Sequence, residues 1–198
     1  VGKYLGYDIT TEYYINDAGA QMDLLGLSVS LAARDFLFKE DVTYPETYYR
    51  GEYLIDIANV VIEKFGKDII YDEARFKEIA FFSKDLVMEI IIKDLKDLGI
   101  TFDNFVSEKS LYSSWDTTKE VLEKNGSLYS KDEKIYLKST QYGDDSDRVV
   151  VRDNGIPTYL AGDIIYHKNK YDRKFDRYIN IWGADHHGYI PRVKAAVE

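Results

Sequence analysis

The sequence contains no cysteine, which excludes a disulfide scaffold, a thiolate zinc site and a cysteine nucleophile. No apolar run is long enough to span a bilayer, and the first residues lack the pattern of a secretory signal. These absences predict a cytoplasmic protein with no membrane partner. Basic residues are fewer than acidic residues: the sequence has 26 Lys and Arg against 35 Asp and Glu, which gives a formal net charge of −9. A broad basic face for nucleic acid is therefore not expected on this stretch of chain.

Apolar residues are plentiful enough for a packed core. They make up 45% of the 198 residues, against 31% charged, and this balance excludes the disordered class. Tyrosine is unusually common, with 18 copies, so many rings must keep a polar tip near water or a partner.

The spacing of apolar residues predicts an α/β chain. Helical periodicity covers residues 21–38, 53–65, 72–98, 113–124, 158–169 and 189–197. β-Branched and aromatic runs predict strands over 8–15 and 178–182, an extended segment over 100–106 and a small β-meander over 127–153. Strands near both ends, around a helical block and a meander, are typical of an α/β sheet interrupted by an insertion.

The densest group of chemistry-bearing residues follows the strand predicted over 178–182. Its members are Gly183, Asp185, His186, His187 and Gly188. In open α/β sheets, ligands bind beyond the carboxyl ends of strands, where glycine lets the backbone approach a phosphate or a ribose. The group therefore indicates a binding site rather than a loop whose histidines only cap the next helix.

The string Asp185-His186-His187 also permits a second interpretation, because it is the signature of the DHH phosphoesterases, which hold catalytic metal with it. That chemistry needs further carboxylates at ligand distance, and no Asp-x-Asp motif follows an early strand here. A DHH-type metal-dependent phosphoesterase is therefore the alternative function.

Two further pairs of polar residues are candidates for binding. Tyr159 and Asp163 are four residues apart, so they share one face of a predicted helix and can together accept hydrogen bonds from a cationic ligand. An ordinary surface pair is the alternative. Asn16 and Asp17 end an early predicted strand, and Asp17 can instead cap the following helix.

Taken in order, the motifs of the chain form one set. They lie at residues 12–19, 107–112, 143–145, 147–152, 158–167 and 182–192. This set resembles the catalytic domain of arginyl-tRNA synthetase, a class I aminoacyl-tRNA synthetase, over essentially the full chain.

The resemblance implies a reaction in which arginine and ATP, with Mg²⁺, form arginyl-adenylate and pyrophosphate. The arginyl group then passes to the 3′ end of tRNA(Arg). It implies that Glu108, Tyr159 and Asp163 surround the guanidinium group of arginine, and carboxylates and a phenolic oxygen suit that planar, five-donor cation. It places Asn16 and Asp17 in the loop that lines the amino-acid pocket.

The same resemblance assigns the group after residue 182 to ATP. It implies that Gly183, Asp185, His186, His187 and Gly188 lie at the ribose and adenine of the nucleotide.

The fold implied is a partial Rossmann-like catalytic domain of a class I synthetase, of α/β class, with a helical block and a small β-meander insertion. In this division, residues 1–40 and 156–198 are the two parts of the nucleotide-binding fold, 41–126 the helical block and 127–155 the meander. The arginine pocket is expected where the strands predicted over 8–15 and 178–182 end.

Two motifs of the family do not occur in this sequence: the ATP-binding His-x-Gly-His and the Lys-Met-Ser-Lys-Ser-type loop that steadies pyrophosphate. The chain is therefore expected to be a central fragment of the catalytic domain that does not activate arginine alone.

Overall fold

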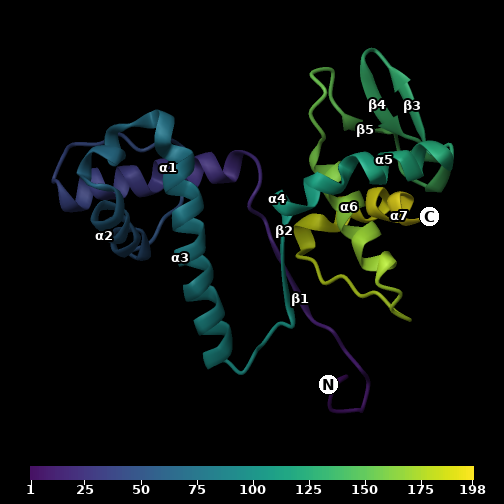
Figure 1. Ribbon diagram of the computed structural model, residues 1–198, viewed down its shortest axis with the longest axis horizontal. Helices are drawn as coiled ribbons and strands as arrows, with labels where there is room; N and C mark the ends of the chain where they lie inside the picture. The colour runs from purple at the N-terminus through teal and green to yellow at the C-terminus, as the bar shows by residue number, and fades with distance from the viewer. The chain divides into compact units, whose positions relative to one another are not determined.

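The computed structural model describes residues 1–198, except for the side chains of Asp185 and His187. The chain divides into two compact units, Val1–Ser107 and Glu108–Glu198 (Figure 1). Both are built from helices and small sheets, so the chain is α/β, as predicted. The four-part division of the sequence stays a prediction.

The first unit is mainly helical. Its elements are β1 (Glu12–Ile15), α1 (Ala20–Ala32), the π-helical turn η1 (Ala33–Leu37), α2 (Tyr53–Phe65), the 3-10 turns η2 (Lys67–Tyr71) and η3 (Glu73–Arg75), α3 (Phe76–Asp97) and β2 (Asn104–Ser107). The three helices predicted in this part of the chain are confirmed, because each apolar period finds a packing partner.

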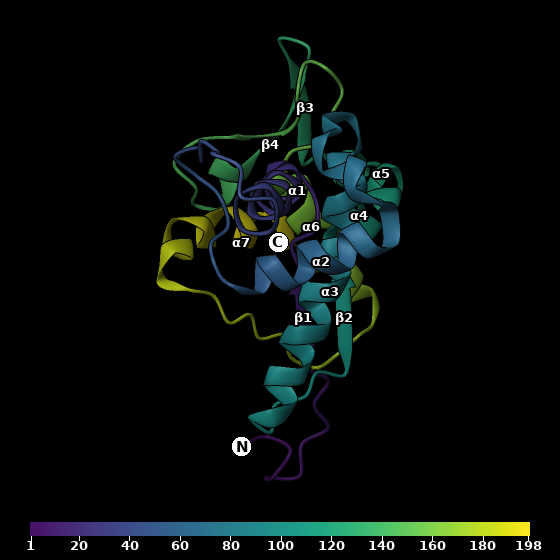
Figure 2. The same cartoon turned by 90° about the vertical axis from the view of Figure 1, so that its left-hand side faces the viewer.

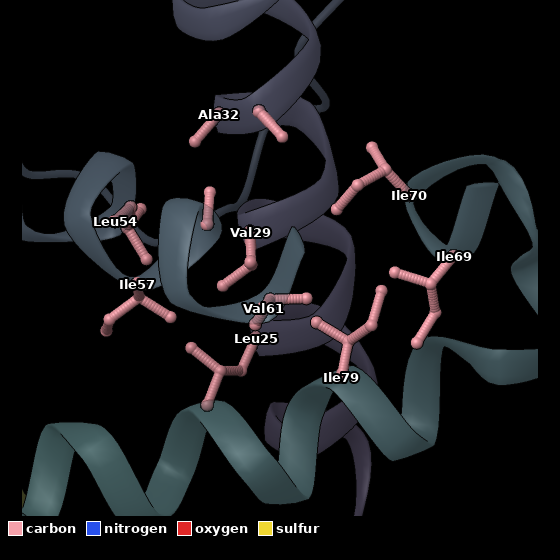
Figure 3. Packing of buried hydrophobic residues seen from close by; sticks show 11 residues of the cluster. Leu25, Val29, Ala32, Leu54, Ile57, Val61, Ile69, Ile70 and Ile79 are labelled. Carbon is pink, nitrogen blue, oxygen red and sulfur yellow. The ribbon is translucent and has the colours of Figure 1, made fainter. Parts of the chain in front are cut away.

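Helices α1, α2 and α3 enclose the apolar core of the first unit (Figure 3). The buried side chains labelled there are Leu25, Val29 and Ala32 from α1, Leu54, Ile57 and Val61 from α2, Ile69 and Ile70 from η2, and Ile79 from α3. Each such aliphatic side chain larger than alanine stabilises the fold by about 1.5–3 kcal/mol when fully buried. The core therefore holds the three helices as one body.

Helices α1 and α3 approach each other closely at Gly26. A Cβ atom at this position would lie 2.2 Å from the carbonyl oxygen of Phe76 and 3.4 Å from the Cβ of Ala80. Any side chain would therefore push the two helices apart, and only glycine fits.

Strands β1 and β2 form a parallel pair, in register from Glu12 opposite Asn104 to Ile15 opposite Ser107 (Figure 2). At the start of the pair, the carboxylate of Asp103 accepts hydrogen bonds from the amide of Thr11 at 2.7 Å and from its hydroxyl at 2.8 Å. These bonds favour the ionised acid and lower the pKa of Asp103 to about 2.

The far end of the same pair is joined by Asp17, which is 2% exposed. The hydroxyl of Ser107 lies 2.9 and 2.8 Å from the two carboxylate oxygens of Asp17, and the Lys84 ammonium of α3 lies 3.7 Å away. The alternative role of Asp17 as a helix cap is wrong, because the cap position of α1 is Gly19 and no side chain bonds there. Asp17 instead ties the end of β1 to the end of β2.

The second unit combines helices with an antiparallel sheet. Its elements are α4 (Glu108–Leu111), η4 (Tyr112–Ser114), α5 (Trp115–Lys124), β3 (Leu128–Lys131), β4 (Lys134–Leu137), η5 (Ser139–Tyr142), β5 (Arg148–Val151), α6 (Tyr159–Asp172), η6 (Ala184–Tyr189) and α7 (Ile190–Val197). Strands β3, β4 and β5 pair in sequence order, which confirms the predicted meander. Its sheet packs on α5 and α6.

The strand predicted over 178–182 is wrong. These residues are extended without ladder pairing, and Ile179 and Ile181 are 81% and 91% exposed. An apolar run becomes a strand only when another strand accepts its backbone hydrogen bonds, and no strand among the described residues does so. The strand predicted over 8–15 is confirmed only at residues 12–15, where β2 pairs with it.

Gly26→Ala should destabilise the first unit. The new methyl group meets backbone rather than a movable side chain, and such overpacking costs about 1–3 kcal/mol, more than the roughly 0.5–1 kcal/mol that alanine gains over glycine in a helix. We expect the free energy of unfolding, measured by urea denaturation, to fall by about 1–2 kcal/mol. Asp23→Ala on the exposed face of α1 is the control, and an equal loss in both variants would contradict the close approach.

Ser107→Ala should also lower the free energy of unfolding, by about 1–3 kcal/mol, because it removes a hydrogen bond to a buried carboxylate. Ser113→Ala is the matched control, since the Ser113 hydroxyl is exposed and bonds only a neighbouring carbonyl oxygen, that of Ser110. Equal urea midpoints for Ser107→Ala and the unchanged chain would show that the Asp17–Ser107 contact does not stabilise the β1–β2 pair.

Candidate functional site

The candidate site lies in the second unit and begins at Glu108, the first residue of α4. Its side chain is 2% exposed. One helical turn later, the hydroxyl of Tyr112 donates a hydrogen bond to Oε1 of Glu108 at 3.2 Å. A carboxylate withdrawn from water needs such donors, so the spacing of four residues supplies Glu108 with one from its own segment.

Helix α6 carries the second acid, Asp163. Its start is fixed by Thr158, whose amide donates to the carbonyl oxygen of Val150 and whose hydroxyl donates to that of Val149, both at 2.9 Å. Tyr159 and Asp163 follow on one face of the helix, Tyr159 half exposed and Asp163 half-buried.

Gly162, the residue before Asp163, packs against the Glu108–Tyr112 pair. A Cβ atom there would lie 3.0 Å from the hydroxyl oxygen of Tyr112 and 3.4 Å from Oε1 of Glu108. Asp163 and Tyr159 both act electrostatically on the Tyr112 hydroxyl. The structure therefore gathers Glu108, Tyr159 and Asp163 in one place, although 50 residues of sequence separate the first two.

A second tyrosine completes the group. Tyr189, the last residue of η6, lies close enough to Asp163 for each group to affect the pKa of the other. Burial raises the pKa of Asp163, and the nearby Tyr189, His186 and Lys170 oppose that rise. Burial and the neighbouring carboxylates raise the pKa of both Tyr112 and Tyr189, so both phenols stay protonated.

Three residues beside these acids, Tyr112, Gly162 and Tyr189, are not among those predicted from the sequence. The spacing of Tyr112 from Glu108 is a signal that could have found it, because residues four apart meet on a helix. Gly162 and Tyr189 carry no such local signal, since each acquires its neighbours only through packing of α6 against other elements.

A chain of hydrogen bonds holds the extended segment 178–182 against α6. The Nδ1 atom of buried His167 lies 2.8 Å from the carbonyl oxygen of Asp163, so Nδ1 carries the proton and donates. Nε2 then accepts from the Asn180 amide at 3.2 Å, and Lys170 donates to the Asn180 oxygen at 2.5 Å. Burial lowers the pKa of His167, which keeps the ring neutral as this pattern requires.

The residues predicted to bind ATP follow this segment. An open hollow of about 410 Å³ is lined by Asn180, Trp182, Gly183, Ala184, His186 and Ile190. The rings of Trp182 and His186 stack with centroids 6.2 Å apart.

Gly188 lies in η6 with open space beside its Cα atom. The side chains of Asp185 and His187, also predicted at ATP, lie outside the described residues.

Asn16 and Asp17, predicted to line the same pocket as Glu108, lie in the first unit. Asn16 is exposed and its side-chain oxygen accepts from Gln21 at 2.6 Å, while Asp17 is buried on Ser107. Ser107, the hydrogen-bond partner of Asp17, is the last residue of β2 and directly precedes Glu108 in the chain. The pocket role of both residues stays a prediction.

Among the described residues, no three His, Asp or Glu side chains are grouped so that they could hold a metal ion. None of the helices in the described part of the chain is both long and apolar enough to cross a bilayer.

Comparison with known proteins gives a consistent set of relatives. The chain is 82% identical over 198 residues to arginine–tRNA ligase of Aliarcobacter butzleri and 60% identical over 197 residues to that of Campylobacter curvus. Each match covers all of this chain and 37% of the relative. No protein-family profile matches the chain.

Solved structures agree. A crystal structure assigned to arginyl-tRNA synthetase of Campylobacter jejuni has a TM-score of 0.92 and 47% identity, over 99% of this chain and 43% of that one. Arginyl-tRNA synthetase of Plasmodium falciparum, at 14% identity and a TM-score of 0.55, shares the fold over 85% of this chain and 29% of its own.

These relatives do not support the alternative of a DHH-type phosphoesterase, since they carry the name of a ligase along the whole chain, the Asp-His-His string included. Identities of 60% and above over every residue leave one assignment. The chain belongs to the arginine–tRNA ligase family and spans 37% of the length of the curated relatives it matches.

Proposed function

We propose that this chain supplies the arginine-recognition site, and part of the ATP site, of an enzyme that charges tRNA(Arg). In the first step, the carboxylate of arginine attacks the α-phosphate of ATP, so that a carbon–oxygen–phosphorus link forms and pyrophosphate leaves. In the second step, the arginyl group passes to the 3′ end of tRNA and AMP leaves. Both steps depend on positioned substrates and stabilised charge rather than on a side-chain nucleophile.

The observation that carries this proposal is the pair of acids around Gly162. Glu108 and Asp163 come from different helices, and both lie close to the Tyr112 hydroxyl. Two carboxylates in a partly desolvated place repel each other, and a bound cation relieves the repulsion. A guanidinium group fits best, because its five donors can bond two carboxylates and the phenolic oxygen of Tyr159 at once.

The same arrangement provides selectivity against lysine. An ammonium group is a compact point charge with three donors, whereas guanidinium is a planar fork that reaches acids on two sides. With lysine bound, one of the two carboxylates would be desolvated without a cation that fully offsets the cost.

For ATP, the proposal uses the segment after the extended residues 178–182. Gly183 and Gly188 allow close approach of a ribose or phosphate, and the stacked rings of Trp182 and His186 border the hollow there. Asp185 and His187 are proposed at the same nucleotide. Mg²⁺ is proposed to be bound together with the phosphates of ATP.

For Asn16 and Asp17 we propose a place at the rim of the amino-acid pocket. The support for it is proximity along the chain, because Asp17 bonds Ser107, which directly precedes Glu108. We further propose that the parallel β1–β2 pair belongs to a Rossmann-like sheet of the class I type and that the protein works in the cytoplasm.

Asp163→Asn in the full-length ligase tests the site. The variant keeps the shape of the side chain and removes one charge, and breaking a desolvated ion pair costs about 2–4 kcal/mol, roughly 30- to 1000-fold in arginine KM. The KM for ATP should change little. Because a cation prefers the ionised carboxylate, arginine kcat/KM of the unchanged enzyme should fall as pH drops through the raised pKa of Asp163, and the variant should lose this dependence. An unaltered arginine KM would show that Asp163 is only a surface acid.

The isolated 198 residues should not activate arginine. Neither the His-x-Gly-His nor the Lys-Met-Ser-Lys-Ser motif occurs in them, and removing comparable charge-stabilising groups costs about 3–4 kcal/mol each. Pyrophosphate exchange with arginine, ATP and tRNA(Arg) should stay at background for the isolated chain and be clear for the full-length enzyme. Turnover by the isolated chain would contradict the view that both motifs are needed.

A further inference from the structure

The extended segment 178–182 is attached to α6 by side chains rather than by a sheet. No strand of the described part of the chain pairs with it, and Ile179 and Ile181 are mostly exposed. At its start, the ring of Tyr178 packs on that of Tyr171 of α6, with centroids 4.3 Å apart. Its next contact with α6 is made by Asn180. Asn180 is therefore the anchor nearer to the residues proposed at ATP.

Helix α6 bonds both polar ends of the Asn180 side chain. The amide nitrogen donates to Nε2 of His167 at 3.2 Å, and the side-chain oxygen accepts from the Lys170 ammonium at 2.5 Å. Turning the amide over would set its N–H groups against the ammonium and its oxygen against the lone pair of Nε2. One orientation of Asn180 is therefore strongly preferred.

His167 is the buried half of this contact. It is 4% exposed, and its Nδ1 atom donates to the carbonyl oxygen of Asp163 at 2.8 Å, which leaves Nε2 as an acceptor. Burying a polar ring costs free energy unless both nitrogens are bonded, and an aliphatic side chain would fill the same place without that cost. The bond to Asn180 accounts for a histidine at this position.

The residue that His167 holds also lines the proposed ATP site. Asn180 borders the hollow of about 410 Å³ together with Trp182 and Gly183, whereas His167 lies behind Asn180 and does not line it. Two residues after Asn180, the ring of Trp182 stacks with that of His186 at the same hollow. The position of this wall therefore depends on the buried imidazole.

We propose that His167 is a positioning residue for ATP, whose Nε2 atom fixes Asn180 and with it the wall of the nucleotide hollow. This inference rests on the proposed binding of ATP by the segment after residue 182. It adds that nucleotide binding depends on a residue of α6, the helix that carries Tyr159 and Asp163, although His167 does not touch the nucleotide.

The test is His167→Leu in the full-length ligase, because it keeps an apolar side chain in the buried place and removes the acceptor for Asn180. We expect the KM for ATP to rise about tenfold, with kcat and the KM for arginine within about twofold of the unchanged enzyme. His167→Gln should restore the ATP KM to within about threefold, because its oxygen can accept from the same amide. The double variant of His167→Leu with Asn180→Ala should have the ATP KM of Asn180→Ala alone, because His167 acts through Asn180.

The matched control is Thr118→Val. Thr118 is also a buried polar residue of the second unit, and its hydroxyl donates to the carbonyl oxygen of Ser114 at 2.8 Å. It lies on α5 and does not line the hollow, so its loss should leave all kinetic constants within about twofold. Thermal midpoints of all variants separate an effect on ATP from a loss of folding.

Three results are decisive. An ATP KM for His167→Leu that matches the Thr118→Val control, an equal rise in the arginine KM, or full additivity with Asn180→Ala overturns the positioning role. Should His167→Leu fail to fold, Asn180→Ala at its exposed position must raise the ATP KM without changing the arginine KM, or the role is refuted. If His186→Ala leaves the ATP KM unchanged, the proposed nucleotide site itself is wrong and this inference fails with it.

Discussion

The burial of two carboxylates beside one glycine is the constraint on which the second unit depends. Glu108 is almost fully withdrawn from water, Asp163 is half-buried, and the Tyr112 hydroxyl donates a hydrogen bond to Glu108. Such an arrangement is costly in a folded chain unless donors and a cation offset the loss of hydration. This cost supports the proposal that the side chains around Gly162 bind a cationic ligand.

Within the first unit, a buried carboxylate lies between the strand pair and the helical core. The three helices share one apolar core, α1 and α3 approach closely at Gly26, and the Lys84 ammonium of α3 lies 3.7 Å from the carboxylate of Asp17. Asp17 in turn holds Ser107, the last residue of β2. A buried carboxylate thus ends the strand pair at the residue before the first acid of the candidate site.

The sequence predicts well those elements whose structure is determined by residues within or next to the element itself. Helix α2 matches its prediction at both ends, because an amphipathic period and Gly66 are local signals. The meander is predicted equally well, from the alternation of apolar and polar residues and from the turn residues between its strands. The run over 178–182 looked like a buried strand for the same local reasons, yet its exposed isoleucines show that pairing is a property of neighbours, not of the run.

The residues of the candidate site likewise fall into two groups, those that local sequence predicts and those that only the packing of the fold brings together. The pairing of Tyr159 with Asp163 followed from helical spacing, and the resemblance to a family supplied Glu108 as their companion. Nothing local in the sequence indicates that Gly162 must lack a side chain or that Tyr189 reaches Asp163, because both depend on how α6 packs. The function of a conspicuous string such as Asp185-His186-His187 is likewise ambiguous until relatives are compared.

The central claim is that Glu108 and Asp163 together recognise a planar cation. It is tested most directly by calorimetric titration of the full-length ligase with L-arginine and with L-citrulline, which has the same shape but no charge. The account predicts that the unchanged enzyme prefers arginine by at least about 100-fold, as expected when a buried ion pair is lost, and that Glu108→Gln removes most of this preference. Equal affinity for the two ligands, or a preference that survives Glu108→Gln unchanged, would contradict it.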